Sequence, residues 1–436
     1  MHVVCLVAVL IGAASDRHGG MAAHDAHNAS RMVGYFTGWS AATYGAAGLE
    51  RVAHKLTHVN YAFARFDESG IVAPLTASDC ANGTWSGCSA AAGNGTLDHV
   101  AAVRDRQAGR LATFISFGGW TWGALRSCRF FSAMANSSTT RARFVGQAVG
   151  FARAMALDGI DIDWEEPGST DAACGGTPPA LDVDNFHALL RELHAAAKAE
   201  GKATARPPLS LSVATPAGVV PARAMKLHRV AHLLSHINVM AYDMHGAWDK
   251  ATGENAPLYD QVLGDLNSVN TTLAAYTAPL GGGGGGGGSG SGSGGEGGWG
   301  GLGLDPAQLA LGLGAYAHQF FVPLNSSAPP PGAVPRHVPI GALSLGNGST
   351  VPYSTVVARA NTMRSYYDMA VEAPTAWGAA DYDGVVEWLG FDNERSVRAK
   401  LDLARAYGVR SAMLWSLDQD DVAHGSPLLT AAWKHL

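Results

Sequence analysis

Eight short apolar segments rich in β-forming residues recur along this chain of 436 residues, and helical segments separate them. They are the ranges 32–36, 57–64, 111–117, 159–164, 209–214, 237–242, 309–316 and 411–417. Several are apolar throughout, as is typical of strands that are covered on both faces. Eight strands alternating with helices predict an α/β fold in which a parallel sheet closes into a (β/α)8 barrel, or TIM barrel.

An open, doubly wound α/β sheet is the alternative fold for the same alternation. That fold carries a glycine-rich phosphate-binding turn after its first strand, and no such signature follows 32–36. A barrel with insertions commonly occupies a chain of this length as one domain. We therefore expect residues 32–436 to form a single barrel domain.

Two segments interrupt the alternation. Residues 281–303 are almost entirely Gly and Ser, without the lysine-ended pattern of a phosphate-binding loop and without a strand before them. We interpret them as a flexible insertion before the seventh strand, because a domain linker there would separate the last two strands from the barrel that they close. Residues 319–387, which contain prolines and several aromatics, form a second insertion after the seventh strand.

The fourth predicted strand carries acids at alternate positions. Within the run DGIDIDWEE, Asp161, Asp163 and Glu165 alternate with apolar residues. Successive side chains of a strand point to opposite faces, so the three acids share one face. Carboxyl groups this close cannot all ionise freely, and the pKa of at least one should rise. A carboxyl group that stays protonated near neutral pH is a general acid, which cleavage of an acetal requires.

Three other interpretations of this strand are a solvated edge strand, an oxygen-ligand site for a divalent cation and a binding site without catalysis. The run also resembles the signature DGxDxDWE of family 18 glycoside hydrolases, the chitinase family. Every specified position of that signature is matched, by Asp158, Gly159, Asp161, Asp163, Trp164 and Glu165.

The resemblance implies a retaining hydrolase in which the acetamido oxygen of the substrate, rather than a second carboxylate, attacks the sugar. It implies that Glu165 donates the proton to the glycosidic oxygen and that Asp163 orients the acetamido N–H. Asp161 would be the buried partner of Asp163, and Asp158 would be structural. The family commonly has a small α+β subdomain after the seventh strand, and 319–387 resembles a reduced form of it.

Two further motifs of the family occur at predicted strand ends. They are SFGGW, with Ser116, Gly118 and Gly119, and MAYD, with Met240, Tyr242 and Asp243. Small residues in the first leave room for the acid strand, and Ser116 can donate a hydrogen bond to a buried carboxylate. The resemblance implies that Tyr242 binds the acetamido carbonyl with assistance from Asp243. A half-buried core residue is the alternative for Tyr242.

A cleft for glycans should be lined with aromatic rings, because these stack on the apolar faces of sugars. Trp415 resembles the tryptophan that lies beneath the scissile sugar in this family. Other aromatics that resemble residues near the acids or at flanking subsites are Tyr35, Phe63, Trp39, Trp120 and Trp248. Each alone is more often a core residue than a subsite, and their shared location after strands favours the cleft.

The chain departs from the family pattern in two places. Glu166 stands beside the predicted acid where an aromatic is usual. In GLGAYAH (312–318), Tyr316 is kept as a cleft residue but His318 replaces the usual arginine, so one cleft hydrogen bond is in doubt.

Neither a metal nor a cofactor is expected. His228, His232 and His236 recur at helical spacing, but His236 leads directly into the sixth strand and should leave the helix. The net charge of -6 and the pI near 6.3 give no reason to expect nucleic acid or a membrane as partner.

The N-terminal residues indicate a secretory route. Val3–Ala14 form an apolar stretch of signal-peptide length, too short to cross a bilayer, so 1–15 are predicted to be a signal peptide. Sequons for N-glycosylation occur at Asn28, Asn82, Asn94, Asn136, Asn270, Asn325 and Asn347. We expect secretion, or the lumen of the secretory or lysosomal pathway.

Four cysteines remain after Cys5, which lies in the predicted signal peptide, and they permit three pairings. Cys80 with Cys88 would close a short loop. Cys128 and Cys174 both follow strands that should be neighbours, so we favour a bond between them.

Together these features predict a monomeric, secreted chitinase that cleaves β-1,4 bonds between N-acetylglucosamine units of chitin or its oligosaccharides. The alternatives are an endo-β-N-acetylglucosaminidase that acts on glycoprotein glycans and a chitin-binding lectin without activity. The presence of both Glu165 and Asp163 disfavours the lectin.

Overall fold

The structure, a computed structural model, describes residues 30–174, 178–261, 266–280, 301–323, 349–359, 362–377 and 385–436. The predicted signal peptide, the sequons at Asn28, Asn325 and Asn347, and residues 281–300 of the Gly/Ser run lie outside this part of the chain.

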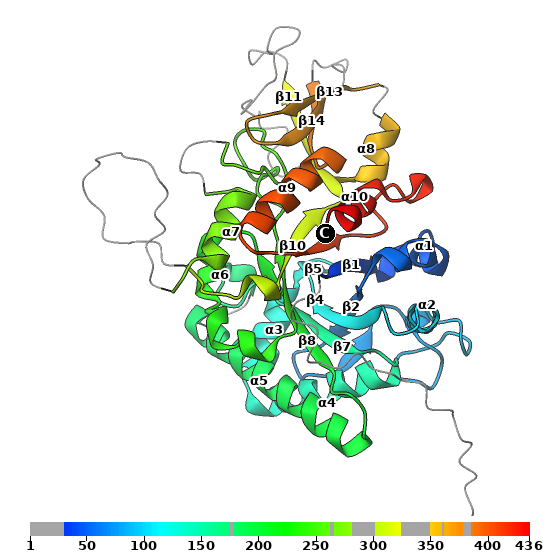
Figure 1. Cartoon of the computed structure of the whole chain (residues 1–436). Coiled ribbons are helices and arrows are strands. Elements are labelled where there is room, and N and C mark those ends of the chain that lie inside the picture. Colours follow the sequence, from blue (N-terminus) through cyan, green and yellow to red (C-terminus); the bar gives the residue numbers. More distant parts are fainter. Residues whose placement is uncertain are drawn as a thin grey trace, which may run out of the picture.

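Parallel strands form a closed barrel at the centre of the molecule (Figure 1). Its strands are β1 Met32–Thr37, β2 His58–Phe66, β4 Ala112–Gly118, β7 Gly159–Asp163, β8 Ser210–Pro216, β9 His236–Met240, β10 Leu309–Gly314 and β16 Ser411–Trp415. They pair in the order β1-β16-β10-β9-β8-β7-β4-β2, and β1 pairs with β2 to close the ring. The predicted (β/α)8 barrel and its eight strands are confirmed.

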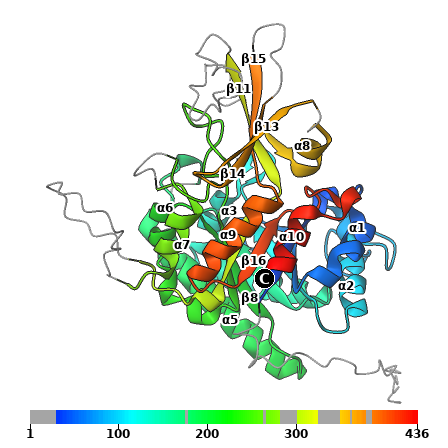
Figure 2. The same ribbon diagram turned by 45° about the horizontal axis from the view of Figure 1, so that its top comes forward.

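Helices surround the barrel, as Figure 2 shows. They are α1 Gly45–Val52, α2 Thr96–Arg106, α3 Ser127–Ala135, α4 Ser138–Ala154, α5 Pro179–Thr204, α6 Val219–Ala224, α7 Val269–Thr277, α9 Glu394–Ala406 and α10 Pro427–His435. In α4 the buried residues Phe144, Ala148 and Phe151 are three or four positions apart, so they form one apolar stripe against the barrel. None of the described helices is long and apolar enough to cross a membrane.

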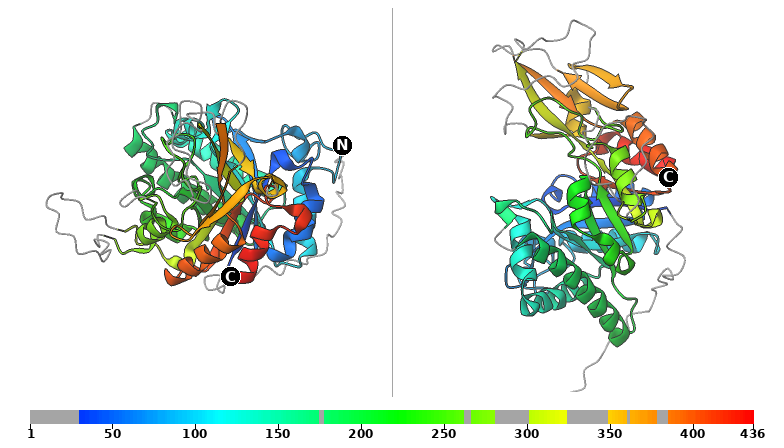
Figure 3. Two further views of the ribbon diagram at one scale, coloured as in Figure 1. Left: turned by 90° about the horizontal axis from the view of Figure 1, so that it is seen from above. Right: turned by 90° about the vertical axis from the view of Figure 1, so that its left-hand side faces the viewer.

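A second sheet follows the carboxyl end of β10 in the chain (Figure 3). It contains β11 Tyr316–Pro323, β12 Thr350–Pro352, β13 Arg364–Asp368, β14 Ala373–Trp377 and β15 Val385–Gly390, with helix α8 Tyr353–Arg359 beside it. These strands pair antiparallel in the order β12-β11-β15-β14-β13. The segment predicted as one strand, 309–316, therefore divides at Ala315, and the sheet begins earlier than the predicted insertion at 319.

Short strands and two disulfides complete the described connections. Strand β3 Val72–Pro74 pairs antiparallel with the end of β2, and β5 Thr121–Trp122 and β6 Leu125–Arg126 form a small hairpin after β4. Disulfides join Cys80 to Cys88 and Cys128 to Cys174, which confirms the favoured pairing.

The two ends of the Gly/Ser run are anchored beside each other between α7 and β10. Leu280 and Gly301 form an isolated bridge, and the Gly303 N–H donates to the Ala278 carbonyl at 2.9 Å. Helix-to-strand connections lie at the barrel end opposite the catalytic loops.

We predict that deletion of residues 283–292, which are all Gly or Ser, leaves both folding and activity intact. Loop-closure entropy changes slowly with length, so the free energy of unfolding should change by about 1 kcal/mol or less. Denaturant unfolding and turnover of a chitin oligomer are the measurements.

Leu302→Ala is the matched control for this deletion, because Leu302 is buried at the anchored base of the same connection. This substitution should cost about 2–5 kcal/mol. If the deletion abolishes turnover in a normally stable protein, the run reaches the substrate.

Candidate active site

The buried carboxyl group of Asp161 is held by side chains from neighbouring strands. In the sheet register Asp161 is the partner of Ser116 on β4 and of Ser212 on β8. Both hydroxyls donate to it, Ser116 Oγ to Oδ2 at 2.7 Å and Ser212 Oγ to Oδ1 at 2.6 Å. Adjacent parallel strands thus place these three side chains at one level inside the barrel.

Two further residues bind the same carboxyl group. Tyr35 Oη donates to Asp161 Oδ2 at 2.8 Å, and Asn238 Nδ2 lies 3.4 Å from Oδ1 and 3.2 Å from Tyr35 Oη. Burial raises the pKa of Asp161, and the hydrogen bonds from the four donors oppose that rise. Donors to a carboxylate favour its ionised form, so this group is prepared to hold a negative charge.

Asp163 lies one pleat closer to the carboxyl end of β7 and lacks such donors. Its Oδ1 atom is buried without a hydrogen-bond partner among the described residues. Burial, followed by the negative charges of Glu165, Asp161 and Glu166, raises the pKa of Asp163 well above its usual value. Asp163 therefore keeps its proton to a higher pH than an ordinary aspartate does.

Glu165 lies at the rim of the barrel, two residues beyond Asp163. The strand was predicted to end at Glu165, but β7 ends at Asp163. Burial, followed by the charges of Glu166 and Asp243, raises the pKa of Glu165 to about 8, and Arg126 opposes the rise. A carboxyl group with that pKa is protonated at neutral pH and can act as a general acid.

The opposite face of β7 anchors the acid strand. Ile160, Ile162 and Trp164 are buried there, and the Trp164 ring stacks on Phe131 of α3 with centroids 5.0 Å apart and planes at 7°. Alternation of acid and apolar residues thus separates a polar interior from a packed exterior.

Two glycines at the end of β4 allow this strand to approach. Gly118 and Gly119 have φ angles of 125° and 82°, and the Gly119 N–H donates to the Asp163 carbonyl at 3.0 Å. A Cβ atom on Gly118 would lie 1.9 Å from the Asp163 carbonyl oxygen. At the other end of the strand, Thr113 Oγ1 donates to Asp158 Oδ2 at 3.0 Å, so Asp158 joins β4 to β7.

Tyr242 and Asp243 follow the end of β9, whose last residue is the half-buried Met240. Burial, then the charges of Asp243, Asp163, Glu165 and Asp161, raise the pKa of Tyr242 well above its usual value. The Tyr242 phenol therefore stays protonated and is available as a hydrogen-bond donor.

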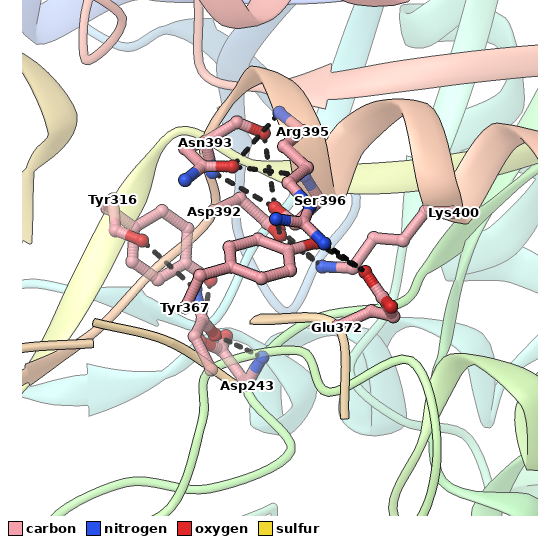
Figure 4. A network of polar contacts seen from close by, with 10 residues as sticks. Asp243, Tyr316, Tyr367, Glu372, Asp392, Asn393, Arg395, Ser396 and Lys400 are labelled. Atoms are coloured by element: carbon pink, nitrogen blue, oxygen red, sulfur yellow. Dashed lines mark hydrogen bonds and ion pairs between the residues drawn. The ribbon is translucent and has the colours of Figure 1, made fainter. Parts of the chain in front are cut away.

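Asp243 is fixed by two residues of β11. Tyr316 Oη donates to Asp243 Oδ1 at 2.6 Å (Figure 4). His318 Nε2 lies 2.7 Å from the same oxygen. His318 therefore contacts Asp243 from the position where an arginine is usual. The loss of the arginine put a hydrogen bond in doubt at this position, and here the imidazole of His318 makes a contact with Asp243.

Aromatic rings gather around the carboxyl ends of the strands. The Trp415 ring stacks on Phe63 at a centroid distance of 5.8 Å and meets the edge of Tyr35 at 5.4 Å. The exposed fractions of Trp39, Trp120 and Trp248 are 55%, 53% and 59%. Large apolar side chains left in solvent around a buried polar cluster indicate a ligand-binding surface.

A cavity of about 90 Å³ lies beside Asp243, between the loops that follow β8 and β9. Its lining residues are Ala217, Gly218, Asp243, Met244, Leu266, Asn267 and Thr272.

The histidines at helical spacing do not converge. His236 is the first residue of β9 and is buried against His58 with ring centroids 5.0 Å apart, whereas His228 and His232 are exposed. Within the described ranges, no group of three or more His, Cys, Asp or Glu side chains is placed to hold a metal ion.

Several residues of the site were missed by reasoning from the sequence. Ser212 and Asn238 lie on predicted strands, and the register of adjacent strands was the available signal for Ser212. Nothing in the sequence pattern singled out Arg126, or the buried ion pair of Asp392 and Lys400 (Figure 4), in which each side chain is 1% exposed.

The family model for glycosyl hydrolases family 18 matches residues 31–420. The oviduct-specific glycoprotein of Sus scrofa is 28% identical over 409 residues, which are 91% of this chain and 66% of that protein. Chitotriosidase-1 of Mus musculus is 28% identical over 323 residues, which are 72% of this chain and 59% of that protein. This chain therefore spans less than two thirds of the length of either relative.

Solved structures show the same fold. A mutant GH18 chitinase from Cycas revoluta in complex with (GlcNAc)4 superposes with a TM-score of 0.67 and 22% identity. The superposition covers 93% of this chain and 99% of that one.

We predict that Gly118→Ala disrupts the site while a helical glycine tolerates the same change. The added methyl group would collide with the Asp163 carbonyl in a backbone conformation that alanine disfavours, at a cost of about 1–3 kcal/mol or more. Gly146→Ala in α4 meets nothing within 4 Å and should stabilise by about 0.5–1 kcal/mol. Urea unfolding measures both, and equal effects of the two substitutions would contradict the close approach.

Proposed function

Because the chain belongs to family 18 of the glycosyl hydrolases, we propose that it is a chitinase that cleaves β-1,4 bonds between N-acetylglucosamine units with retention. The observation that carries the proposal is Glu165 at the barrel rim, whose pKa is raised to about 8 above a row of two buried aspartates. The exposed tryptophans and the neighbouring structure with bound (GlcNAc)4 support an N-acetylglucosamine oligosaccharide as substrate.

In the first step Glu165 donates its proton to the glycosidic oxygen, and the acetamido oxygen of the same sugar attacks the anomeric carbon. The Tyr242 hydroxyl donates to that acetamido oxygen and holds it in line. The product is a cyclic oxazolinium ion, so no enzyme carboxylate needs to form a covalent bond with the sugar.

The aspartates balance the charges of this step. Glu165 becomes a carboxylate as it loses its proton, and the protonated Asp163 then donates a hydrogen bond toward it while keeping its own proton. The other carboxyl oxygen of Asp163 accepts a hydrogen bond from the acetamido N–H and orients that group, and the negative charge now on Glu165 stabilises the positive oxazolinium. Asp161 keeps its own negative charge on the hydrogen bonds from Tyr35, Ser116, Ser212 and Asn238.

In the second step a water molecule attacks the anomeric carbon from the side that the leaving group vacated. Glu165, now a carboxylate, accepts a proton from this water and recovers its starting state. Two displacements at one carbon retain its configuration. We propose that the protein does this chemistry as a secreted monomer.

Two other functions use the same barrel. An endo-β-N-acetylglucosaminidase would release glycans from a high-mannose glycopeptide, and a lectin would bind chitin oligomers without cleaving them. Turnover of a labelled chitin oligomer, compared with turnover of the glycopeptide and with binding alone, separates the three.

We predict that Glu165→Gln lowers kcat on chitin oligomers by at least about 10²–10⁴-fold, the usual contribution of a general acid. The amide keeps the shape of the side chain but cannot give up a proton, so binding of the oligomer should be preserved. Stopped assays of product release and calorimetric binding are the measurements.

Glu192→Gln on α5 is the control, since it neutralises a glutamate that pairs with Arg141 far from β7. This variant should keep its turnover. A Glu165→Gln protein with near-normal kcat would remove Glu165 from the proposed role.

A further inference from the structure

Arg126, the last residue of β6, touches both loops that flank the proposed general acid. Its guanidinium carbon lies 3.1 Å from the ring centroid of Trp120, on the loop after β4. On the loop after β7, Nη1 lies 2.9 Å from Asp171 Oδ2 and Nη2 lies 3.4 Å from the backbone oxygen of Glu165. Arg126 thus brings a positive charge to the backbone of the acid itself.

The position of this charge is fixed by covalent and ionic links. The Cys128–Cys174 disulfide joins the same two loops, and Cys128 lies two residues after Arg126. The Arg126 side chain is 17% exposed, compared with 40% for Asp171. Water therefore screens Arg126 weakly on the side of the acid, and Asp171 compensates its charge chiefly at the surface.

Glu166 brings the opposite charge to the same loop. It follows Glu165 directly and is half-buried, and Trp164, two residues before it, is packed against α3. The charge of Glu166 acts on Asp163, on Glu165 and on Tyr276 of α7. The cation that acts on Glu166 in turn is Arg126.

The groups that face Glu165 come from every element around it. They are the carboxyl groups of Asp163, Glu166 and Asp243, the phenols of Tyr242 and Tyr316, and the guanidinium of Arg126. Asp161 lies one pleat below Asp163 on β7, and His318 contacts Asp243. Within the part of the chain that the structure describes, Arg126 is the cation that opposes these carboxyl groups at Glu165.

We propose that Arg126, in contact with the backbone of Glu165, and Glu166, the next residue along the chain, are positioning residues of opposite charge that together set the pH range over which this acid keeps its proton. The proposal rests on the proposed function, because it assigns a purpose to the protonation of Glu165. It also gives a role to Glu166, which stands where an aromatic is usual in this family.

The two charges should have opposite effects on the pH dependence of cleavage. The alkaline limb of kcat/KM reports loss of the proton from the general acid of the free enzyme. Removing a nearby cation makes that proton harder to lose and moves the limb to higher pH, whereas removing a nearby anion moves it to lower pH.

The experiment measures kcat/KM on a chitin oligomer from pH 4 to 10 for the intact chain and its variants. Arg126→Gln should move the alkaline limb up by about 0.5–1 pH unit, and Glu166→Gln should move it down by a similar amount. The double variant should return to within about 0.3 pH unit of the original limb, because the two effects oppose each other.

Two variants separate charge from structure. Arg126→Lys keeps the charge but loses the planar group that lies on Trp120, so it should leave the limb in place even if KM changes. Arg153→Gln removes an arginine of similar exposure, paired with Glu200 at the end of α4, and should leave the limb unchanged. A shift in the Arg153 variant as large as in the Arg126 variant would overturn the proposal.

Direct titration of the carboxyl group makes the test independent of turnover. Glutamate labelled with ¹³C at the carboxyl carbon gives a resonance for Glu165 that disappears in Glu165→Gln. Opposite shifts of its titration in Arg126→Gln and Glu166→Gln support the proposal, even if the protein cleaves no chitin. The absence of cleavage would refute only the proposed function. Unmoved titrations, or shifts in the same direction, overturn the proposal.

Discussion

Removing three closely spaced carboxyl groups from water is the constraint to which the rest of the site responds. Asp161 and Asp163 lie on β7 and Glu165 lies two residues beyond its end, and burial raises the pKa of each. A buried carboxylate is stable only where donors replace water, and otherwise the group keeps its proton. The barrel supplies four donors to Asp161. Neighbouring parallel strands bring side chains to the same height as Asp161, which explains why these donors reach it. The result is a row that runs from a hydrogen-bonded aspartate inside the barrel to a glutamate at the rim whose pKa is raised to about 8.

The same row includes a carboxyl oxygen without a hydrogen-bond partner. Asp163 Oδ1 is buried and lacks a partner among the described residues, so in the mechanism proposed above this oxygen can accept a hydrogen bond from the acetamido N–H of the substrate. Donors like those of Asp161 would favour the ionised form of Asp163, which would then have no proton with which to hydrogen-bond Glu165. A buried polar group without a partner lowers the stability of the fold, so the unpaired Oδ1 of Asp163 lowers stability at the position where the proposed chemistry uses it.

Periodic patterns along the sequence predicted the strands and the row of acids, but contacts between residues that are distant in the sequence were missed. The barrel, the acid strand and the Cys128–Cys174 bond followed from alternation and strand order, because neighbouring strands bring their loops together. Ser212 and Asn238 were missed because an isolated Ser or Asn in an apolar strand has no signature, and its partner is distant in sequence. The break between β10 and β11 at Ala315 was missed for a related reason. The residues on both sides of Ala315 are equally compatible with one continuous strand, and only closure of the barrel at Gly314 decides where β10 ends.

The second sheet is part of the site because an ion pair holds it to the barrel. Asp392 follows β15, Lys400 lies on α9, and both side chains are buried, so losing one partner would leave an uncompensated charge, at a typical cost of about 3–5 kcal/mol. β15 pairs with β11, where Gly390 is the register partner of His318. His318 and Tyr316 in turn fix Asp243, whose charge raises the pKa of Glu165. A buried ion pair away from Glu165 therefore helps to determine where one of the charges that act on Glu165 lies, and the second sheet contributes structurally to the candidate site.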